Sequence, residues 1–203
     1  MTAATTTPVA VESPWTELVG ALRADHATIV RYAEKYPSPG HGSSSLLGDL
    51  VRKAGFQMIA SYRMMRFFRR AGLPLFAQVV SRLVRVVYGA DLHWDAEIEP
   101  GVMIVHGMGL CVSHSARVAS GAILFQNVTL GEGIDAETRQ LGAPRVEADV
   151  HIGPGATLVG PITVGAGSKI TAGCFVTRSI PAGSVVEAPA PVVRPRTAVE
   201  PRS

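Results

Sequence analysis

The sequence predicts a mainly β protein, a left-handed parallel β-helix of hexapeptide repeats, preceded by a small α-helical region. Two observations lead to this fold class. An aliphatic residue recurs at every sixth position in the second half of the chain, and apolar residues at helical spacing fill much of the first half. The later aliphatic run is Val146, Ile152, Leu158, Val164, Ile170 and Val176. A period of six fits neither an α-helix nor a plain alternating strand.

An earlier run keeps the same period. Its aliphatic positions are Leu92, Ile98, Ile104 and Leu110, and then Val118, Leu124 and Leu130. We expect two additional residues, Ala116 and Arg117, to shift the phase between these two sets. Each hexad supplies one short strand and one turn, and three hexads close one triangular coil. The aliphatic residue points into the prism, and small residues such as Gly153 and Gly155 allow tight corners. The β-helix is therefore expected over residues 90–186, with Cys174 in its core.

The repeat stops over residues 131–145, a polar segment that contains glycine. We expect it to be a loop excursion from one corner, a common location for functional residues. Residues 15–89 are expected to form three or four helices, with breaks at Pro37, Pro39 and Gly40 and again at Gly72 and Pro74. Residues 1–14 are expected to be disordered, and the Pro-rich tail 187–203 extended or disordered.

Composition narrows the function classes. The formal net charge is only +3 in 203 residues, which does not favour nucleic-acid binding. The two cysteines, Cys111 and Cys174, form no CxxC motif, so neither a disulfide framework nor a zinc site is predicted. No signal-peptide pattern or membrane span is recognisable, and we expect a soluble, cytoplasmic protein. The arginine-rich segment 62–70 could contact an anionic membrane, but we expect its apolar stripe to be buried in a subunit interface.

The chain resembles a known family. Its hexads, the His106–Gly107 corner and the loop that ends in Ala143-Pro144-Arg145-Val146 resemble the serine O-acetyltransferase family of hexapeptide-repeat acyltransferases. The resemblance covers about residues 46–193 and is more specific around Asp91, His106 and the segment 125–131. Segment 62–70 is also similar to the helix that precedes the β-helix in short family members.

The resemblance implies an acetyl-coenzyme A-dependent O-acetyltransferase that needs no metal. It implies a homotrimer or a dimer of trimers, with coenzyme A bound in clefts between neighbouring prisms. Carried over residue by residue, the base is His106 and its orienting carboxylate Asp91, with Asp95 as the alternative. The backbone amides on the thioester side fall near Gly131 and Glu132. The implied coenzyme A contacts are Pro154, Gly155, Lys169, Ala172 and Gly173.

The chain departs from serine-specific members at the acceptor. There an aspartate precedes the base and an Arg-His pair precedes the proline that closes the loop, whereas this chain has Val105, Gly142 and Ala143. Arg139 or Gln140 of the longer loop could substitute for the missing groups. The His-Gly corner and the short helical region are closer to the branch that acetylates sugars in bacterial exopolysaccharides. We therefore expect the acceptor to be a hydroxyl of a sugar, glycan or metabolite, with L-serine as the alternative.

Acyl transfer from a thioester to an alcohol requires removal of a proton during attack. Unperturbed imidazoles titrate near pH 6.5, so most are neutral at about pH 7 and can accept that proton. A carboxylate on the other ring nitrogen fixes the tautomer, and a backbone amide can stabilise the oxyanion. Two other hypotheses remain: a non-catalytic assembly module, and a zinc carbonic anhydrase using three histidines. The spacings of His106, His114 and His151 support no such metal set.

Overall fold

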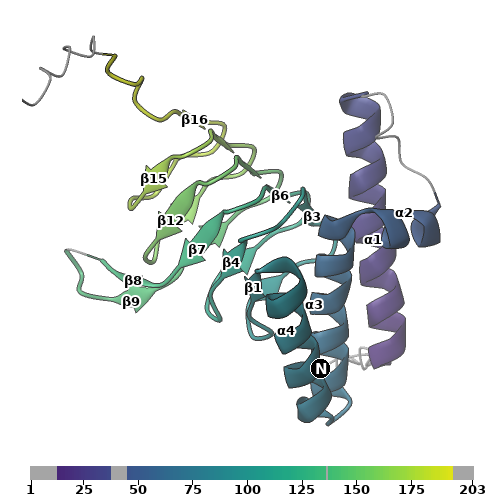
Figure 1. Cartoon of the computed structure of the whole chain (residues 1–203). Helices are drawn as coiled ribbons and strands as arrows, with labels where there is room; N and C mark the ends of the chain where they lie inside the picture. Colours follow the sequence, from purple (N-terminus) through teal and green to yellow (C-terminus); the bar gives the residue numbers. More distant parts are fainter. Residues whose placement is uncertain (1–12, 38–44, 136, 194–203) are drawn as a thin grey trace, which may run out of the picture.

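The computed structural model describes residues 13–37, 45–135 and 137–193 (Figure 1). Four helices come first: α1 (Pro14–Lys35), α2 (Leu46–Arg52), α3 (Ala54–Arg70) and α4 (Pro74–Tyr88). Ser13 caps α1 by accepting a hydrogen bond from the Thr16 amide at 3.1 Å, so the helix begins one residue before the predicted boundary at residue 15. Gly72, at φ 73°, lies between α3 and α4, and Pro74 begins α4.

Short strands follow. They are β1 (Asp91–Leu92), β2 (Glu97–Ile98), β3 (Met103–Ile104), β4 (Cys111–Val112), β5 (Arg117–Val118), β6 (Ile123–Leu124), β7 (Thr129–Gly131), β8 (Gly133–Ile134), β9 (Leu141–Gly142), β10 (Arg145–Val146), β11 (His151–Ile152), β12 (Thr157–Val159), β13 (Thr163–Val164), β14 (Lys169–Ile170), β15 (Phe175–Val176) and β16 (Val185–Val186).

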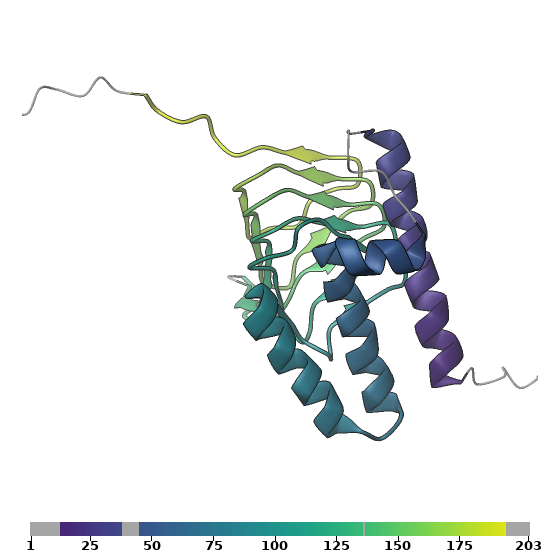
Figure 2. The same ribbon diagram turned by 45° about the vertical axis from the view of Figure 1, so that its right-hand side comes forward.

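Three parallel sheets form the walls of a prism (Figures 1 and 2). Sheet A has the order β1-β4-β7-β12-β15, sheet B β13-β10-β5-β2, and sheet C β16-β14-β11-β6-β3. The aliphatic residues of the repeat are buried, with Leu124, Leu158 and Ile170 at 0% exposure, and Cys174 is buried beside them. The predicted left-handed β-helix, with helices before it, is confirmed.

One detail of the predicted repeat is wrong. The register pairs Leu92 with Val112, and Val112 with Leu130, so Val112 occupies the inward position that was assigned to Leu110. The two additional residues therefore lie between Ile104 and Val112, not at residues 116–117. The sequence misled because Leu110 is also aliphatic and also buried. Only strand pairing distinguishes two aliphatic residues that are two positions apart.

The interruption of the repeat is more ordered than a loop. Strands β8 and β9 pair in antiparallel fashion and form a hairpin that projects from the prism (Figure 1). The repeat resumes at β10, where Val146 pairs with Val118 of the preceding coil. The excursion therefore does not change the register in which the next coil stacks on the preceding one.

The helices pack against the first coils of the prism (Figure 2). A buried ion pair fixes this contact. Asp25 of α1 accepts hydrogen bonds from Arg63 Nε at 2.9 Å and from the Gly101 and Val102 amides at 2.8 and 3.1 Å. Arg63 also donates to the carbonyls of Ile98 and Glu99. One salt bridge therefore connects two helices to a corner of the first coil.

Part of the apolar stripe of segment 62–70 lies inside the chain. Tyr62 and Met65 of α3 are buried at 1% and 0% exposure, among residues of α1, α4 and the first coil. The burial of these two residues therefore does not require a subunit interface, and the predicted interface stays a prediction. Within the described residues, no helix is both long and apolar enough to cross a membrane. Most of the segments expected to be disordered, residues 1–12 and 194–203, lie outside the described residues.

Candidate active site

His106 lies at the corner between β3 and β4, where the two additional residues of the repeat are located. Its φ is 61°, in the left-handed region that non-glycine residues rarely adopt. The Gly107 amide donates to the Val105 carbonyl at 2.7 Å, which closes a three-residue turn with His106 at its centre. The His106 side chain is exposed. A strained backbone that presents an imidazole to solvent is typical of a functional position.

Glycines make this corner possible. Gly107 has φ 80°, and a Cβ on it would lie 2.5 Å from Met58 Sδ of α3 and 2.6 Å from Ile104 Cγ2. A Cβ on Gly109 would lie 2.0 Å from Asn127 Oδ1 in the next coil. The corner is therefore packed between a helix and the following coil. This packing holds the backbone that carries His106 in place.

Asp91 begins β1 and lies close to the same corner. Its amide donates to the Leu110 carbonyl at 2.8 Å, and the Leu110 amide donates to the Gly107 carbonyl at 3.0 Å. The Asp91 carboxylate is bound by Arg85 of α4, whose Nε and NH2 contact Oδ1 at 3.0 and 2.9 Å. No hydrogen bond among the described residues joins Asp91 to His106. Since both Arg85 contacts go to Oδ1, the other carboxylate oxygen keeps its capacity to accept a hydrogen bond.

Asp95, the alternative partner of the base, does not lie at this corner. It belongs to the segment between β1 and β2 and pairs with Arg69 of α3 at 2.7 Å. Cys111 of β4 is paired with Asp91 of β1 in the parallel sheet. Burial raises the pKa of the Cys111 thiol, and the Asp91 carboxylate raises it further, which disfavours a thiolate nucleophile.

Most of the predicted coenzyme A contacts lie on one edge of the prism. We call the corners from sheet C to sheet A, residues 105–110, 125–128, 153–156 and 171–174, the His106 edge. These corners are joined by backbone hydrogen bonds from Asn127 to Met108, from Gly155 to Gln126 and from Gly173 to Pro154, at 2.9, 3.0 and 2.9 Å.

The His106 edge is open. A Cβ on Gly155 or Gly173 would meet no atom within 4 Å, and Ala172 is exposed. Lys169 does not lie on this edge. It begins β14, whereas the corner 171–174 follows the end of that strand, and it pairs in register with His151. Burial lowers the pKa of His151, and the charges of Lys35 and Lys169 lower it further. Lys169 therefore flanks sheet C rather than this edge.

Gly131 and Glu132 lie on a different edge. We call the corners from sheet A to sheet B, residues 93–96, 113–116, 132–144 and 160–162, the hairpin edge. Glu132 accepts a hydrogen bond from Ser115 Oγ at 2.6 Å and lies 3.4 Å from His114 Nε2. Sheet A separates this edge from the His106 edge. One chain therefore does not bring these predicted thioester-side residues to His106.

The residues predicted to contact the acceptor also lie in different parts of the structure. Arg139, at φ 58°, and Gln140 are exposed in the hairpin. Its turn is held by Asp135 Oδ1, which accepts from the Thr138 amide at 2.6 Å, and hydrogen bonding to Thr138 lowers the pKa of Asp135. Val105, next to His106, and Ala143 are half-buried and pack against the core.

The structure adds features that the sequence did not indicate. The Oε1 atom of Gln126, on the His106 edge, is buried without a hydrogen-bond partner in the described residues. Such an acceptor is unusual and is consistent with a site that binds a donor. Arg85 was not predicted to bind Asp91. Arg85, in the last turn of a helix, precedes Asp91 by six residues, and this spacing does not by itself predict a contact between them.

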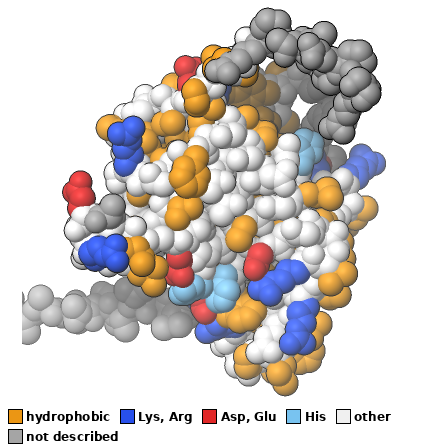
Figure 3. Space-filling model, turned by 60° about the vertical axis from the view of Figure 1, so that its left-hand side comes forward, with side chains coloured by type: hydrophobic (Ala, Val, Ile, Leu, Met, Phe, Trp, Pro, Cys, Tyr) orange, Lys and Arg blue, Asp and Glu red, His pale blue; other side chains and the backbone are white. Residues whose placement is uncertain are grey.

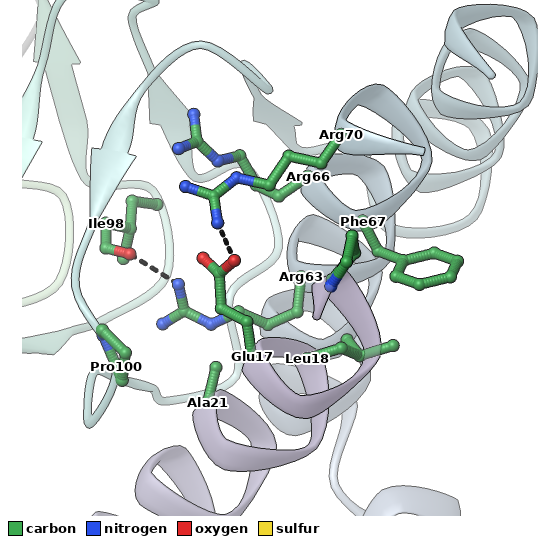
Figure 4. A pocket seen from close by; sticks show the side chains of 10 residues that line it. Glu17, Leu18, Ala21, Arg63, Arg66, Phe67, Arg70, Ile98 and Pro100 are labelled. Atoms are coloured by element: carbon green, nitrogen blue, oxygen red, sulfur yellow. Dashed lines mark hydrogen bonds and ion pairs between the residues drawn. The ribbon is translucent and has the colours of Figure 1, made fainter. Parts of the chain in front are cut away.

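A small cavity elsewhere in the chain does not coincide with the predicted site. It lies between α1, α3 and the first coil and is lined by Glu17, Arg63, Arg66, Phe67 and Arg70, among others (Figure 4). Its volume of about 70 Å³ is well below the roughly 300 Å³ at which ligand pockets begin. None of its lining residues belongs to the His106 edge.

The three histidines of the carbonic anhydrase hypothesis lie at different edges. His106 is on the His106 edge, His114 on the hairpin edge, and His151 begins β11 after the corner from sheet B to sheet C. One chain cannot bring them to a single ion. In the described part of the chain, no group of three His, Cys, Asp or Glu side chains is placed to hold a metal.

Comparisons with known proteins agree with this architecture. No protein-family profile matches the chain. The serine acetyltransferase of Synechococcus elongatus is 32% identical over 154 residues, 75% of this chain and 60% of that protein. That of Bacillus pumilus is 34% identical over 143 residues, 70% of this chain and 64% of that protein. The chain thus spans less than two thirds of the length of these relatives.

Solved structures extend the likeness to the helices. The Neisseria gonorrhoeae serine acetyltransferase in complex with serine has a TM-score of 0.72 and 25% identity, covering 87% of this chain and 69% of its own. The Brucella abortus serine acetyltransferase in complex with coenzyme A has a TM-score of 0.71 and 28% identity, covering 88% and 68%. Across its helices and its β-helix, the chain is therefore similar to serine acetyltransferases in both sequence and fold.

Proposed function

We propose that the protein is an acetyl-coenzyme A-dependent O-acetyltransferase with His106 as general base. The observation that carries the proposal is the exposed, strained imidazole at a corner that interrupts the repeat. A β-helix built only to pack does not need two additional residues at one corner. The names of the relatives support the same reaction class.

The proposed dyad requires a contact between the Asp91 carboxylate and the His106 ring that the described residues do not make. Asp91 is close to the His106 corner through backbone bonds, and its Oδ1 is held by Arg85. With Oδ1 bound to the guanidinium, Oδ2 can receive the N–H of the His106 ring, which orients the other ring nitrogen toward the acceptor. His106 would then take the proton from the hydroxyl during attack.

Coenzyme A is proposed to bind along the His106 edge. The thioester supplies the activated acetyl group when bound. Pro154, Gly155, Ala172 and Gly173 leave the edge without large side chains, so that an extended ligand could lie along it. The buried Gln126 oxygen offers an acceptor there. The Brucella abortus relative was solved with coenzyme A, which supports this assignment.

The complete site is proposed to lie between copies of the chain. His106 and the hairpin with Gly131 and Glu132 are at opposite edges of sheet A, so a second prism is required to bring one to the other. We propose a homotrimer, which repeats this contact three times in a closed ring. Light scattering coupled to gel filtration should give three times the chain mass of 21.4 kDa, or six times for a dimer of trimers. A monomer that acetylates its acceptor at full rate would contradict this proposal.

The acceptor is proposed to be a hydroxyl of a sugar, glycan or metabolite. Val105, Gly142 and Ala143 provide no charge to bind an amino acid's ammonium and carboxylate, and Arg139 and Gln140 are exposed in the hairpin. L-serine is the second candidate, because the relatives are named for it and one was solved with it. A cytoplasmic location is part of the same proposal, because the reaction consumes acetyl-coenzyme A.

A screen of acceptors tests the function. Purified protein is mixed with acetyl-coenzyme A and either L-serine or a sugar from a panel. The reaction is followed by measuring the free thiol of the released coenzyme A. We expect turnover with a sugar-type acceptor that exceeds turnover with serine. Turnover of serine and of none of the sugars would contradict the proposed sugar-type acceptor. No binding of coenzyme A in a calorimeter would contradict catalysis and favour the assembly-module hypothesis.

A further inference from the structure

The outer side of α4 is an exposed apolar face. Its inner side, with Ala77, Ser81 and Val84, is buried against the rest of the chain. The outer side consists of Leu75, Phe76, Val79, Leu83, Val86 and Val87, which we call the α4 face. These side chains are between 52% and 83% exposed, and Leu73, just before the helix, is 44% exposed. They recur at spacings of three and four residues, so they share one side of the helix. Six large apolar side chains together on a surface helix indicate a binding surface.

The charged residues of α3 and α4 are all arginines. Arg66, Arg69, Arg70, Arg82 and Arg85 are exposed or half-buried, whereas Arg63 is buried against Asp25. Arg82, on α4 itself, is exposed and has no described hydrogen bond or ion pair. Arg69, Arg70 and Arg85 form ion pairs with carboxylates of other segments, and their side chains are 43%, 51% and 51% exposed.

Such exposed ion pairs contribute little to stability, so the guanidinium groups of Arg69 and Arg70 can exchange a carboxylate for another anion. Figure 3 shows hydrophobic and Lys/Arg side chains next to each other at the lower end of the molecule, the end at which the α3–α4 hairpin lies in Figure 1. The surface therefore combines apolar area with cations, and α4 carries no acidic residue of its own.

We propose that the α4 face binds the surface of a bilayer that contains anionic lipids. An amphipathic helix with arginine on its polar side and leucine, valine and phenylalanine on the other is the element that lies in the plane of such an interface. Its 15 residues give a helix of about 22 Å, which lies along the membrane, and no described helix could cross one. The apolar side chains enter the acyl boundary while Arg82 and its neighbours contact lipid phosphates.

A second copy of the chain bound through a two-fold contact is a poorer occupant. Such a contact would place the α4 face, with Arg82 and Arg85, against the same arginines of the partner, and α4 carries no acidic residue. Like charges facing each other oppose association. An anionic lipid surface supplies the missing opposite charge over the whole length of the helix.

The test is co-sedimentation of the full chain with vesicles. Vesicles of phosphatidylcholine alone would be compared with vesicles in which about a third of the lipid is phosphatidylglycerol. The variant is Val79→Gln/Leu83→Gln/Val86→Gln, which removes apolar side chains that are 52%, 56% and 83% exposed and keeps good helix formers. The matched control is Val192→Gln/Val193→Gln, which changes valines that are 81% and 87% exposed outside the helices.

We expect the wild type and the control to bind anionic vesicles, less strongly as salt rises, and neutral vesicles far less. The triple variant should lose more than about tenfold in partitioning with unchanged thermal unfolding. Arg82→Gln should weaken the anionic preference alone. Three results would overturn the proposal: no binding to anionic vesicles, equal binding of the triple variant, or a triple variant with a smaller assembly mass by light scattering. The last result would mean that the face joins copies of the chain.

Discussion

His106→Ala is expected to reduce acetyl transfer to the true acceptor by about 10²–10⁴-fold, the usual contribution of a general base. The imidazole is exposed, so its removal leaves no cavity, and the corner that carries it is held by Gly107, Met58 and Asn127 rather than by the ring. The loss should therefore appear in kcat, and coenzyme A affinity measured by calorimetry should be unchanged. The rate is followed as released thiol.

His151→Ala is the matched control, because this histidine is at another edge of the prism and half-buried. It should retain most of the activity. If His106→Ala consumed acetyl-coenzyme A at the wild-type rate with the acceptor present, the imidazole would not be the base. Equal losses in both variants would point to a general effect on the fold.

Asp25→Ala should be the most destabilising single change in the helical region. Asp25 is fully buried and accepts four hydrogen bonds, two from Arg63 and two from backbone amides of the first coil. Removing one partner leaves a buried guanidinium without its counter-charge, which costs about 3–5 kcal/mol. Urea unfolding followed by circular dichroism measures the change in the free energy of unfolding.

Asp95→Ala provides the comparison. It also breaks an ion pair with an α3 arginine, Arg69, but both side chains are more than 40% exposed. An exposed pair of this kind contributes about 0–1 kcal/mol. The two variants should therefore differ by at least about 2 kcal/mol. Similar losses would show that burial does not set the strength of the Asp25–Arg63 contact.

The sequence determined the core of this fold by itself. Because a period of six matches only one way of coiling, the aliphatic residues at 146–176 predicted the prism, and their burial agrees. The breaks at Pro37, Gly72 and Pro74 agree with the end of α1 and with the boundary between α3 and α4, since these residues act through local backbone geometry. The boundary between α2 and α3, at Lys53, has neither residue type. His106 could be singled out because its neighbours Gly107 and Gly109 allow an unusual corner.

Only the tertiary structure decided the rest, because it depends on contacts between residues distant in sequence. Strand pairing moved the two additional residues from 116–117 to the His106 corner. Packing showed that α3 is buried within the chain while α4 exposes its apolar side, although both helices are amphipathic. The prism geometry placed Gly131 and Glu132 across sheet A from His106. Spacing along a chain specifies which face a side chain occupies, but the partner that covers that face is chosen in three dimensions.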